Sequence, residues 1–257
     1  MITAGCDIGS RTAKAVILEK NTIISNAVIP ARLDPRESAA EVLEEALSRA
    51  NLDRNRLSRI VGTGYGQKEI PFADKTASEI ICHAKGAWWV HPGTRMIVDI
   101  GGQDSKVTQI DDTGNVLRYA YNDKCAAGTG RFLEVMADAL MVDISHMGEK
   151  GKQFKEKLSI SNQCVIFAET EVVSLINEDK DIADILNALH HAMANRVSSQ
   201  ARSMGITEDV VMTGGVAKNI GVFDALQESL NVPVISMDGV DPQIMGALGA
   251  ALIAATG

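Results

Sequence analysis

The sequence predicts an α/β protein made of two similar lobes, each a mixed sheet flanked by helices. Apolar runs of strand length alternate with longer stretches of helical periodicity. A strand-like run ending in Asp-Ile-Gly occurs twice, at 7–9 and again 92 residues later at 99–101. Apolar residues make up 46% of the 257 residues, so the chain can bury a sizeable core in one large domain or two small ones.

The first half is expected to open with three strands joined by short turns. Ser38 and Glu41 fit a capping box, and the apolar stripe that follows them predicts a helix. A short strand near Ile60 then precedes a glycine-rich turn. The expected strands cover 2–8, 15–19, 22–29 and about 60–61, and a further helix covers about 76–89.

The second half repeats this plan and adds helices. Four positions coincide between the copies: Asp7 with Asp99, Ile8 with Ile100, Gly9 with Gly101, and Lys14 with Lys106. The repeat predicts a first lobe at 1–93 and a second at 94–242, facing each other across a cleft. The small-residue-rich final helix, about 243–257, is expected to pack back on the first lobe. The other expected elements are strands at 96–100, 210–212 and 232–236 and helices at 167–177 and 182–204.

Each copy of the repeat has a corner, the strand-to-turn segment 7–14 or 99–106, that is suited to bind a nucleotide. Asp7 and Asp99 can each reach a magnesium ion through water, and the glycine after each lets backbone amides approach phosphate. Lys14 can neutralise charge nearby, and Gly214-Gly215 allows the backbone to lie against a nucleoside. Two facing corners would clamp one Mg-nucleotide. The alternative is that these are ordinary glycine turns.

Two cysteines stand at what look like the starts of helices. Cys125 precedes a small-residue turn and an apolar helical pattern that begins at about Gly128, and Cys164 precedes Val-Ile-Phe. The free amides of a helix start favour a thiolate, so these two sulfurs are interpreted as half of a metal-cluster site. The alternative is that both are small buried hydrophobes. Cys6 on a core strand and Cys82 in a helix are expected to be packing residues.

Composition excludes several classes of protein. The formal net charge is −8 and there is no basic run, which argues against a nucleic-acid partner. The N-terminus lacks the plan of a signal peptide and no apolar run approaches a membrane span, so a cytoplasmic protein without a membrane partner is expected. The absence of Cys-x-x-Cys excludes a self-contained zinc ribbon or bacterial ferredoxin site.

The motifs also carry a resemblance to a known family. Several segments resemble the two phosphate loops, two connecting segments and adenosine loop of the actin, hexokinase and Hsp70 superfamily, whose lobes are ribonuclease-H-like; they are 7–14, 62–66, 99–106, 212–219 and 246–251. The cysteine segments 122–134 and 161–171 resemble those of the ATP-dependent activators of 2-hydroxyacyl-CoA dehydratases. The wider family includes the ATPase subunits of benzoyl-CoA reductase and the reductases of double-cubane cluster proteins.

The resemblance implies a site and a mechanism. One [4Fe–4S] cluster is held between two identical subunits, with Cys125 and Cys164 as the ligands from each chain. An electron from a reduced ferredoxin or flavodoxin passes, with ATP hydrolysis that moves the lobes, to an iron–sulfur dehydratase or reductase. Such an exposed cluster is oxygen-sensitive, which suits an anaerobe. The cofactors implied are the cluster, ATP/ADP and Mg²⁺.

Asp7, Asp99 and Gln103 are the expected catalytic residues, although Gln103, which could orient the attacking water, is equally well a structural residue of its turn. The expected nucleotide contacts are Ser10, Arg11, Thr12, Ala13, Lys14, Gly101, Gly102, Gly214, Gly215 and, more weakly, Gln243. Two other functions stay open. One is a sugar-type kinase of the same fold, in which Asp104 could be the catalytic carboxylate. The other is a nucleotide-dependent scaffold that catalyses no reaction.

Overall fold

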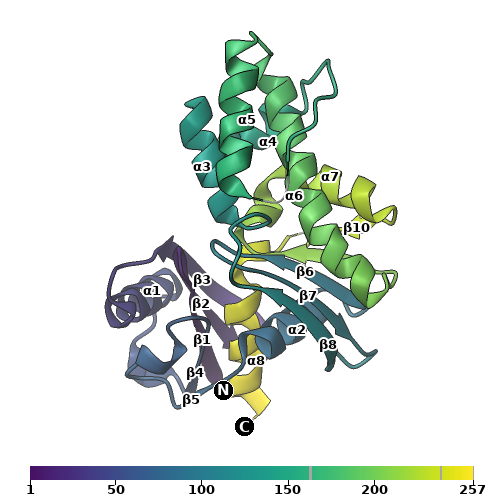
Figure 1. Ribbon diagram of the computed structural model, residues 1–257. Helices are drawn as coiled ribbons and strands as arrows, with labels where there is room; N and C mark the ends of the chain where they lie inside the picture. The colour runs from purple at the N-terminus through teal and green to yellow at the C-terminus, as the bar shows by residue number, and fades with distance from the viewer. Residues whose placement is uncertain (162–163, 238, 257) are drawn as a thin grey trace. The chain divides into compact units, whose positions relative to one another are not determined.

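The computed structural model describes residues 1–161, 164–237 and 239–256 (Figure 1). The predicted fold class is confirmed, because these residues form two five-stranded sheets flanked by helices. The chain divides into two compact units. Unit 1 comprises Met1–Ile97, Thr108–Arg118 and Met237–Gly257, and unit 2 comprises Val98–Val107 and Tyr119–Ser236.

The first sheet is mixed and has the order β3-β2-β1-β4-β5. Its strands are β1 (Ile2–Ile8), β2 (Thr12–Glu19), β3 (Thr22–Pro30), β4 (Arg59–Thr63) and β5 (Lys75–Thr76). The first three strands form an antiparallel meander, whereas β4 pairs parallel to β1 and β5 pairs parallel to β4. The register of β1 against β2 sets Asp7 opposite Lys14. The two residues of the repeated corner are therefore neighbours because of a short hairpin.

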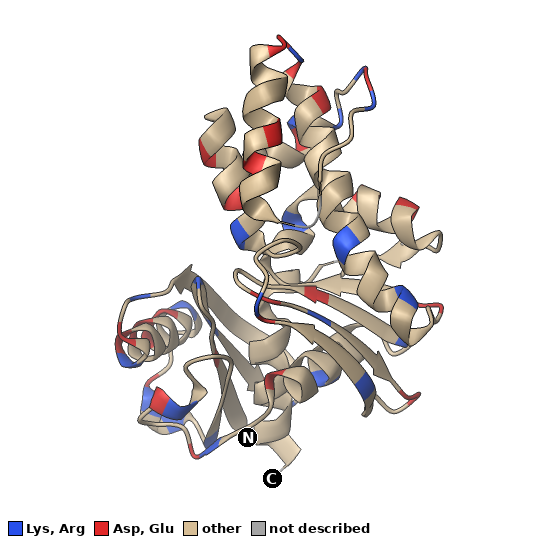
Figure 2. Cartoon of the chain, viewed as in Figure 1, with Lys and Arg blue, Asp and Glu red and all other residues tan. Residues whose placement is uncertain are grey.

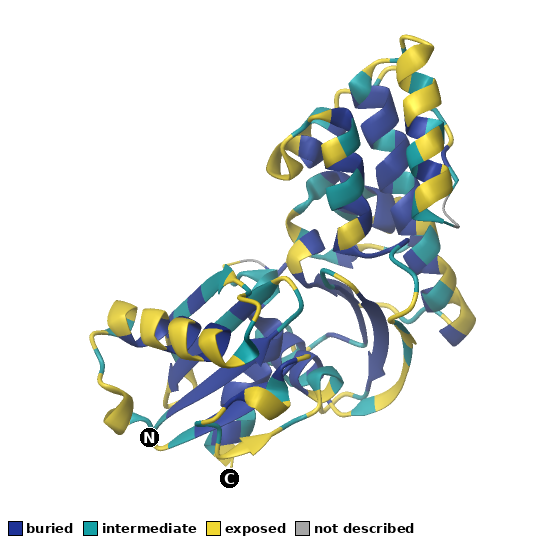
Figure 3. Ribbon diagram, turned by 60° about the vertical axis from the view of Figure 1, so that its left-hand side comes forward, coloured by how far each residue is buried: buried dark blue, intermediate teal, exposed yellow. Residues whose placement is uncertain are grey.

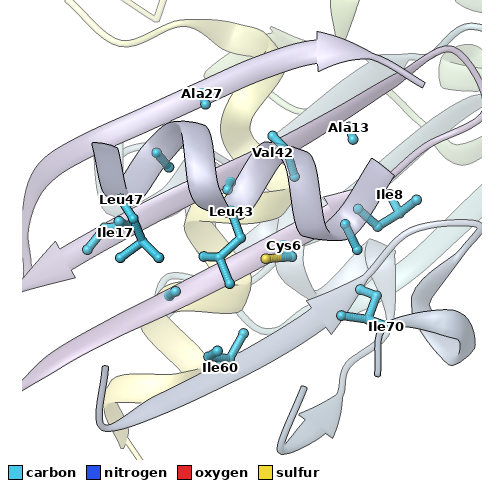
Figure 4. Close-up of a cluster of buried hydrophobic side chains, with 14 residues drawn as sticks. Cys6, Ile8, Ala13, Ile17, Ala27, Val42, Leu43, Leu47, Ile60 and Ile70 are labelled. Carbon is cyan, nitrogen blue, oxygen red and sulfur yellow. The ribbon is translucent and has the colours of Figure 1, made fainter. Parts of the chain in front are cut away.

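Helix α1 (Pro35–Ala50) covers one face of this sheet and closes its main core. Figure 4 shows the cluster, in which side chains of α1 meet those of the strands. It includes Cys6, Ile8, Ala13, Ile17, Ala27, Val42, Leu43, Leu47, Ile60 and Ile70. Because side chains alternate along a strand, burying Cys6 and Ile8 under α1 turns Asp7 to the opposite face.

The capping box predicted at the start of this helix is wrong. The helix begins at Pro35, and the Asp34 side chain caps it by accepting a hydrogen bond from Arg36 N at 2.8 Å. Ser38 is buried within the helix, where its hydroxyl accepts from Arg32 N at 2.8 Å. A fixed-φ proline at the first helical position, after an aspartate cap, starts the helix one turn earlier than Ser38 would.

Helix α8 (Met245–Thr256) packs on the other face of β1, and α2 (Glu79–Val90) packs on α8. The close helix approach predicted from the small residues of α8 is confirmed. A Cβ on Gly249 would lie 1.8 Å from Cys82 O, and one on Gly5 would lie 2.0 Å from Ala247 O. The prediction of helix from Thr76 is wrong, because Lys75–Thr76 pairs with β4 as a strand and the helix starts at Glu79.

The second sheet has the order β10-β9-β6-β7-β8. Its strands are β6 (Met96–Ile100), β7 (Ser105–Ile110), β8 (Val116–Asn122), β9 (Val210–Thr213) and β10 (Val234–Ile235). The helices of unit 2 are α3 (Gly130–Leu140), α4 (Met147–Gly151), α5 (Val165–Asn177), α6 (Ile182–Met204) and α7 (Ile220–Leu230). The helix predicted at 182–204 is confirmed, and β10 is shorter than the predicted 232–236. Residues 162 and 163 of the cysteine motif and residue 257 of the predicted final helix lie outside the described residues.

Burial follows the layers of each unit, as Figure 3 shows: the central strands β1, β6, β7 and β9 are largely buried, whereas β8 and the outer sides of helices are largely exposed. The segment Thr108–Arg118 contributes a turn to unit 1, where Trp88 Nε1 donates to Asp112 O at 3.2 Å. Gly114 has a φ of +76° and a Cβ there would lie 2.7 Å from the Trp88 ring. Trp88 is therefore a packing residue. No helix among the described residues combines the length and the apolar character needed to cross a bilayer.

Candidate functional site

The first corner lies in unit 1, where β1 ends. Asp7 is 2% exposed, and its Oδ2 lies 3.2 Å from Lys14 Nζ on the facing strand. Gly9 N donates to Thr12 O at 3.1 Å, which closes the turn between the strands. A buried carboxylate is therefore held beside a lysine at the mouth of a tight turn.

The second corner lies in unit 2, where β6 ends, and has the same plan with one addition. Lys106 Nζ lies 3.6 Å from Asp99 Oδ2 but only 2.7 Å from Asp104 Oδ2. Gly101 N donates to Asp104 O at 2.9 Å, closing the Gly101–Asp104 turn. Both carboxylates are buried. Lys106 therefore lies closer to Asp104 than to Asp99, and the position of the first corner that corresponds to Asp104 is Thr12.

A glycine with left-handed backbone presses against each corner aspartate. Gly64 follows β4 with φ +85°, and Gly214 follows β9 with φ +86°. A Cβ on these residues would lie 2.3 Å from Asp7 Oδ1 and 2.8 Å from Asp99 Oδ1, respectively. Thr213 Oγ1 also donates to Asp99 Oδ1 at 3.0 Å. The repeat therefore includes a Thr-Gly pair where β4 and β9 end, Thr63-Gly64 and Thr213-Gly214. Both pairs are visible in the sequence, but sequence analysis did not align them with each other.

One carboxylate oxygen of Asp7 lacks a partner among the described residues. Its Oδ1 is buried and accepts no hydrogen bond from any described residue. A Cβ on Gly246 would lie 2.8 Å from Asp7 Oδ2 and 2.9 Å from His83 Nε2, so any larger residue at this position would crowd the carboxylate. Buried polar atoms are normally satisfied, and a hydrated cation satisfies a carboxylate oxygen of this kind. The residues present therefore fit a Mg²⁺ ion.

The remaining predicted nucleotide residues of unit 1 divide into two groups. Ser10, Arg11 and Thr12 lie at the exposed or half-buried turn, and Gln243 Nε2 donates to Thr12 Oγ1 at 3.2 Å. The structure thus brings together residues 231 positions apart. Ala13 is fully buried in the core under α1, so its methyl group is a packing group.

In unit 2, Gln103 lines a hollow beside the segment that carries Cys125. The lining residues are Gln103, Asp123, Lys124, Ala126 and Arg131. Gly102 is half-buried next to Gln103, and Gly215 is exposed at the start of the short 3₁₀ helix Gly215–Lys218. The predicted water-orienting residue and the predicted cluster segment therefore share one surface.

Cys125 lies in a loop, Asn122–Thr129, which we call the cysteine loop. The Asn122 side chain spans it: Oδ1 accepts from Cys125 N at 3.2 Å, and Nδ2 donates to Cys125 O at 2.9 Å and to Ala127 O at 3.4 Å. Cys125 itself is half-buried. Gly128, with φ +85°, lies against Arg196 of α6. The loop is therefore held at its start by one amide side chain and at its end by a glycine contact.

The expected direction of the helix amides at this loop is wrong. Helix α3 begins at Gly130, and Gly130 N and Arg131 N donate to Gly101 O and Gly102 O, both at 2.8 Å. The next amide, Phe132 N, donates to Thr129 O at 3.0 Å. The first two amides donate to the Gly101–Asp104 turn and the third to Thr129, so none of the three is available to Cys125. Packing has brought carbonyl acceptors to them.

Cys164 occupies the N-cap position of α5, with an extended backbone (φ −144°), and is half-buried. Helix α5 packs against α3, so both helices that follow a cysteine belong to one helical layer. Glu171 Oε2 accepts from Ser161 N at 2.7 Å and thereby holds the chain that leads to Cys164. Figure 2 shows acidic positions, coloured red, along α3 and α5.

The other two cysteines differ in environment. Cys6 and Cys82 are fully buried in unit 1, and none of the four cysteines forms a disulfide. Burial raises the pKa of each thiol to about 12, and the nearby Asp7 charge adds to the rise. Both are protonated packing residues at neutral pH, which leaves Cys125 and Cys164 as the thiols suited to bind a metal.

Two five-stranded mixed sheets, each with an Asp–Lys corner at the end of a strand, define the chain as a protein of the actin-like ATPase fold. Structures of sugar kinases of the ROK family resemble it at TM-scores of 0.59 and 0.57 but at only 14% and 16% identity, which shows the fold alone. The family model described as the BadF/BadG/BcrA/BcrD ATPase family matches residues 4–254. The chain belongs to this family.

Relatives within the family are similar over almost the whole chain. The 2-hydroxyisocaproyl-CoA dehydratase activator of Clostridioides difficile is 43% identical over 254 residues, which are 99% of this chain and 95% of the relative. A structure of that activator with bound ADPNP gives a TM-score of 0.95 and covers 99% of this chain and 94% of its own. The crystal structure of component A of the (R)-2-hydroxyglutaryl-CoA dehydratase of Acidaminococcus fermentans gives a TM-score of 0.96 at 40% identity. It covers 100% of this chain and 98% of its own.

Proposed function

We propose that the protein is an ATP-hydrolysing activator that delivers low-potential electrons to a 2-hydroxyacyl-CoA dehydratase or a related iron–sulfur reductase. The observation that carries the proposal is the pair of half-buried thiols, Cys125 and Cys164, each ahead of a helix in a chain that matches activators from end to end. The same similarity favours an activator over a sugar-type kinase, whose structures share the fold alone.

The nucleotide is assigned to the two Asp–Lys corners. Asp7, whose Oδ1 accepts no hydrogen bond from a described residue, is assigned to hold hydrated Mg²⁺. Asp99 is the carboxylate assigned to the Mg-nucleotide at the second corner. Lys14 offsets phosphate charge beside Asp7. The backbone amides around Gly101 and Gly214 approach phosphate and nucleoside because glycine leaves them uncovered. Gln103, which is exposed, is assigned to orient the attacking water.

The thiols are assigned to a [4Fe–4S] cluster shared by two identical chains. One chain offers two suitable sulfurs, and the usual site needs four, so a two-fold dimer completes it. When bound, the cluster supplies a one-electron carrier between a reduced ferredoxin or flavodoxin and the dehydratase or reductase. Cys125 and Cys164 bind it as thiolates, and the loop bonds of Asn122 orient Cys125. ATP is required because an uphill transfer costs about 1.4 kcal/mol for each ~59 mV of one-electron potential.

The test is anaerobic purification followed by assays of iron, sulfide and mass in solution. We expect about four irons per dimer, the content of one four-iron cluster, and loss of iron in both Cys125→Ser and Cys164→Ser. The matched control is Cys6→Ala, which removes a buried thiol of unit 1 and retains the iron. An iron-free monomer that phosphorylates a sugar would overturn the proposal.

A further inference from the structure

The start of α3 is hydrogen-bonded to the Gly101–Asp104 turn of the same unit. Besides the two amide bonds at 2.8 Å to Gly101 O and Gly102 O, the backbones are in close contact. A Cβ on Gly130 would lie 3.1 Å from Gly101 O and 3.3 Å from Gly102 Cα. Helix and turn therefore cannot move against each other without breaking two backbone hydrogen bonds. Breaking them is costly because the backbone groups would be left unpaired.

The end of β8 links the Gly101–Asp104 turn to the cysteine loop. Tyr121 OH lies 3.2 Å from Asp104 Oδ2, and the Lys106 ammonium lies 5.3 Å from the centre of the Tyr121 ring. The next residue, Asn122, bonds the cysteine loop on both sides of Cys125 and reaches Ser105 Oγ at 3.5 Å. Adjacent residues of one strand thus contact the charged corner and the cysteine loop.

We propose that Asn122 is a positioning residue that couples the Gly101–Asp104 turn to the cysteine loop, so that nucleotide bound at this turn changes the exposure of the Cys125 sulfur. The coupling rests on the proposed function only in requiring that the corner of unit 2 binds nucleotide. Helix α3 supplies one link through backbone amides and Asn122 supplies the other through its side chain. The amide is suited to this task because it donates and accepts at once.

The inference predicts an effect on thiol chemistry that needs no iron. Alkylation proceeds through the thiolate and depends on access to the sulfur. Cys6 and Cys82 are buried with pKa values raised to about 12, so they react slowly in the folded protein. If nucleotide shifts the loop between two arrangements, the Cys125 rate changes by the coupling factor, which we expect to be about fivefold or more.

The experiment measures alkylation of reduced, metal-free protein by iodoacetamide, with and without Mg-ADPNP, and assigns the sites by peptide mass spectrometry. We expect Mg-ADPNP to change the Cys125 rate in the wild type. Asn122→Ala should weaken that change, because only the α3 backbone link remains, while still binding Mg-ADPNP in calorimetry. Tyr121→Phe, which keeps the ring beside Lys106 and removes the hydroxyl, should reduce the change. The matched control is Asn177→Ala, an exposed asparagine at the end of α5 that should respond like the wild type.

Three results would overturn the coupling. Mg-ADPNP could bind without changing the Cys125 rate in the wild type, or change it equally in Asn122→Ala. Alternatively, Asn122→Ala could speed Cys125 and Cys164 to the same degree regardless of nucleotide, which is the signature of a loosened fold. In each case the iron-binding proposal still stands, because it is tested by iron content. A protein that binds no nucleotide would overturn the coupling and the proposed ATP hydrolysis together, whereas iron content would still report on the cysteines.

Discussion

His190 of α6 is a buried imidazole, only 1% exposed, and neither ring nitrogen has a hydrogen-bond partner among the described residues. Gly151 and Gly221 lie against it so closely that a Cβ on either would come within 2.6 or 2.3 Å of the ring. Burial, with a smaller effect from His191, lowers the pKa of His190 from 6.5 to about 4. The ring is therefore neutral in the folded protein at neutral pH.

This pKa shift predicts a loss of stability in acid. Below pH 6.5 His190 binds a proton in the unfolded chain, whereas in the folded chain it stays neutral down to about pH 4. The free energy of unfolding therefore falls as pH drops through that window. Above pH 6.5 the group has no effect. At about 1.4 kcal/mol per pH unit, His190 removes about 2 kcal/mol at about pH 5 and about 3 kcal/mol at about pH 4.

The perturbation is His190→Leu, which replaces the ring with an apolar side chain that cannot bind a proton. Urea unfolding of the metal-free protein should be followed by circular dichroism, because α6 lies in unit 2 whereas both tryptophans lie in unit 1. Between about pH 7.5 and about pH 5 the wild type should lose about 2 kcal/mol more than His190→Leu. His191→Gln changes a half-buried neighbour 3.8 Å from Glu228 and should lose nearly as much as the wild type, because His191 makes only the smaller contribution to the pKa shift. If acid destabilised His190→Leu as much as the wild type, the reasoning would be refuted.

Two further predictions concern the corner of unit 1. Asp7→Asn keeps the shape of the side chain and removes its charge, so Mg-dependent ATP hydrolysis should fall about 10- to 100-fold with iron content unchanged; loss of iron instead would refute the assignment of this corner to the nucleotide. Gly64→Ala would set a Cβ 2.3 Å from Asp7 Oδ1 at a φ of +85°. It should lower the free energy of unfolding by more than about 2 kcal/mol, measured by tryptophan fluorescence. Gly239→Ala, at φ +79° with nothing within 4 Å, should cost only about 1–2 kcal/mol, and equal losses in the two variants would contradict the steric argument.

Local pattern was enough to predict the elements whose cause is local. Helix 182–204 follows from a long amphipathic stretch, and strand 2–8 follows from one short apolar run. The start of α1 was missed because two local signals competed and the proline with its aspartate cap prevailed. The strand Lys75–Thr76 was missed because two residues carry no periodicity, and only pairing with β4 makes them a strand.

The amino-acid sequence by itself determined the chemistry available to this protein: two Asp–Lys corners in register, glycines beside them, and two cysteines ahead of helical patterns. Only the tertiary structure decided how these groups are connected. The α3 amides donate to Gly101 and Gly102, and Gly64 reaches Asp7, because packing brings together segments that are distant in the chain. Hydrogen-bond donors pair with whichever acceptor the fold brings to them, and no periodicity in the sequence records that choice.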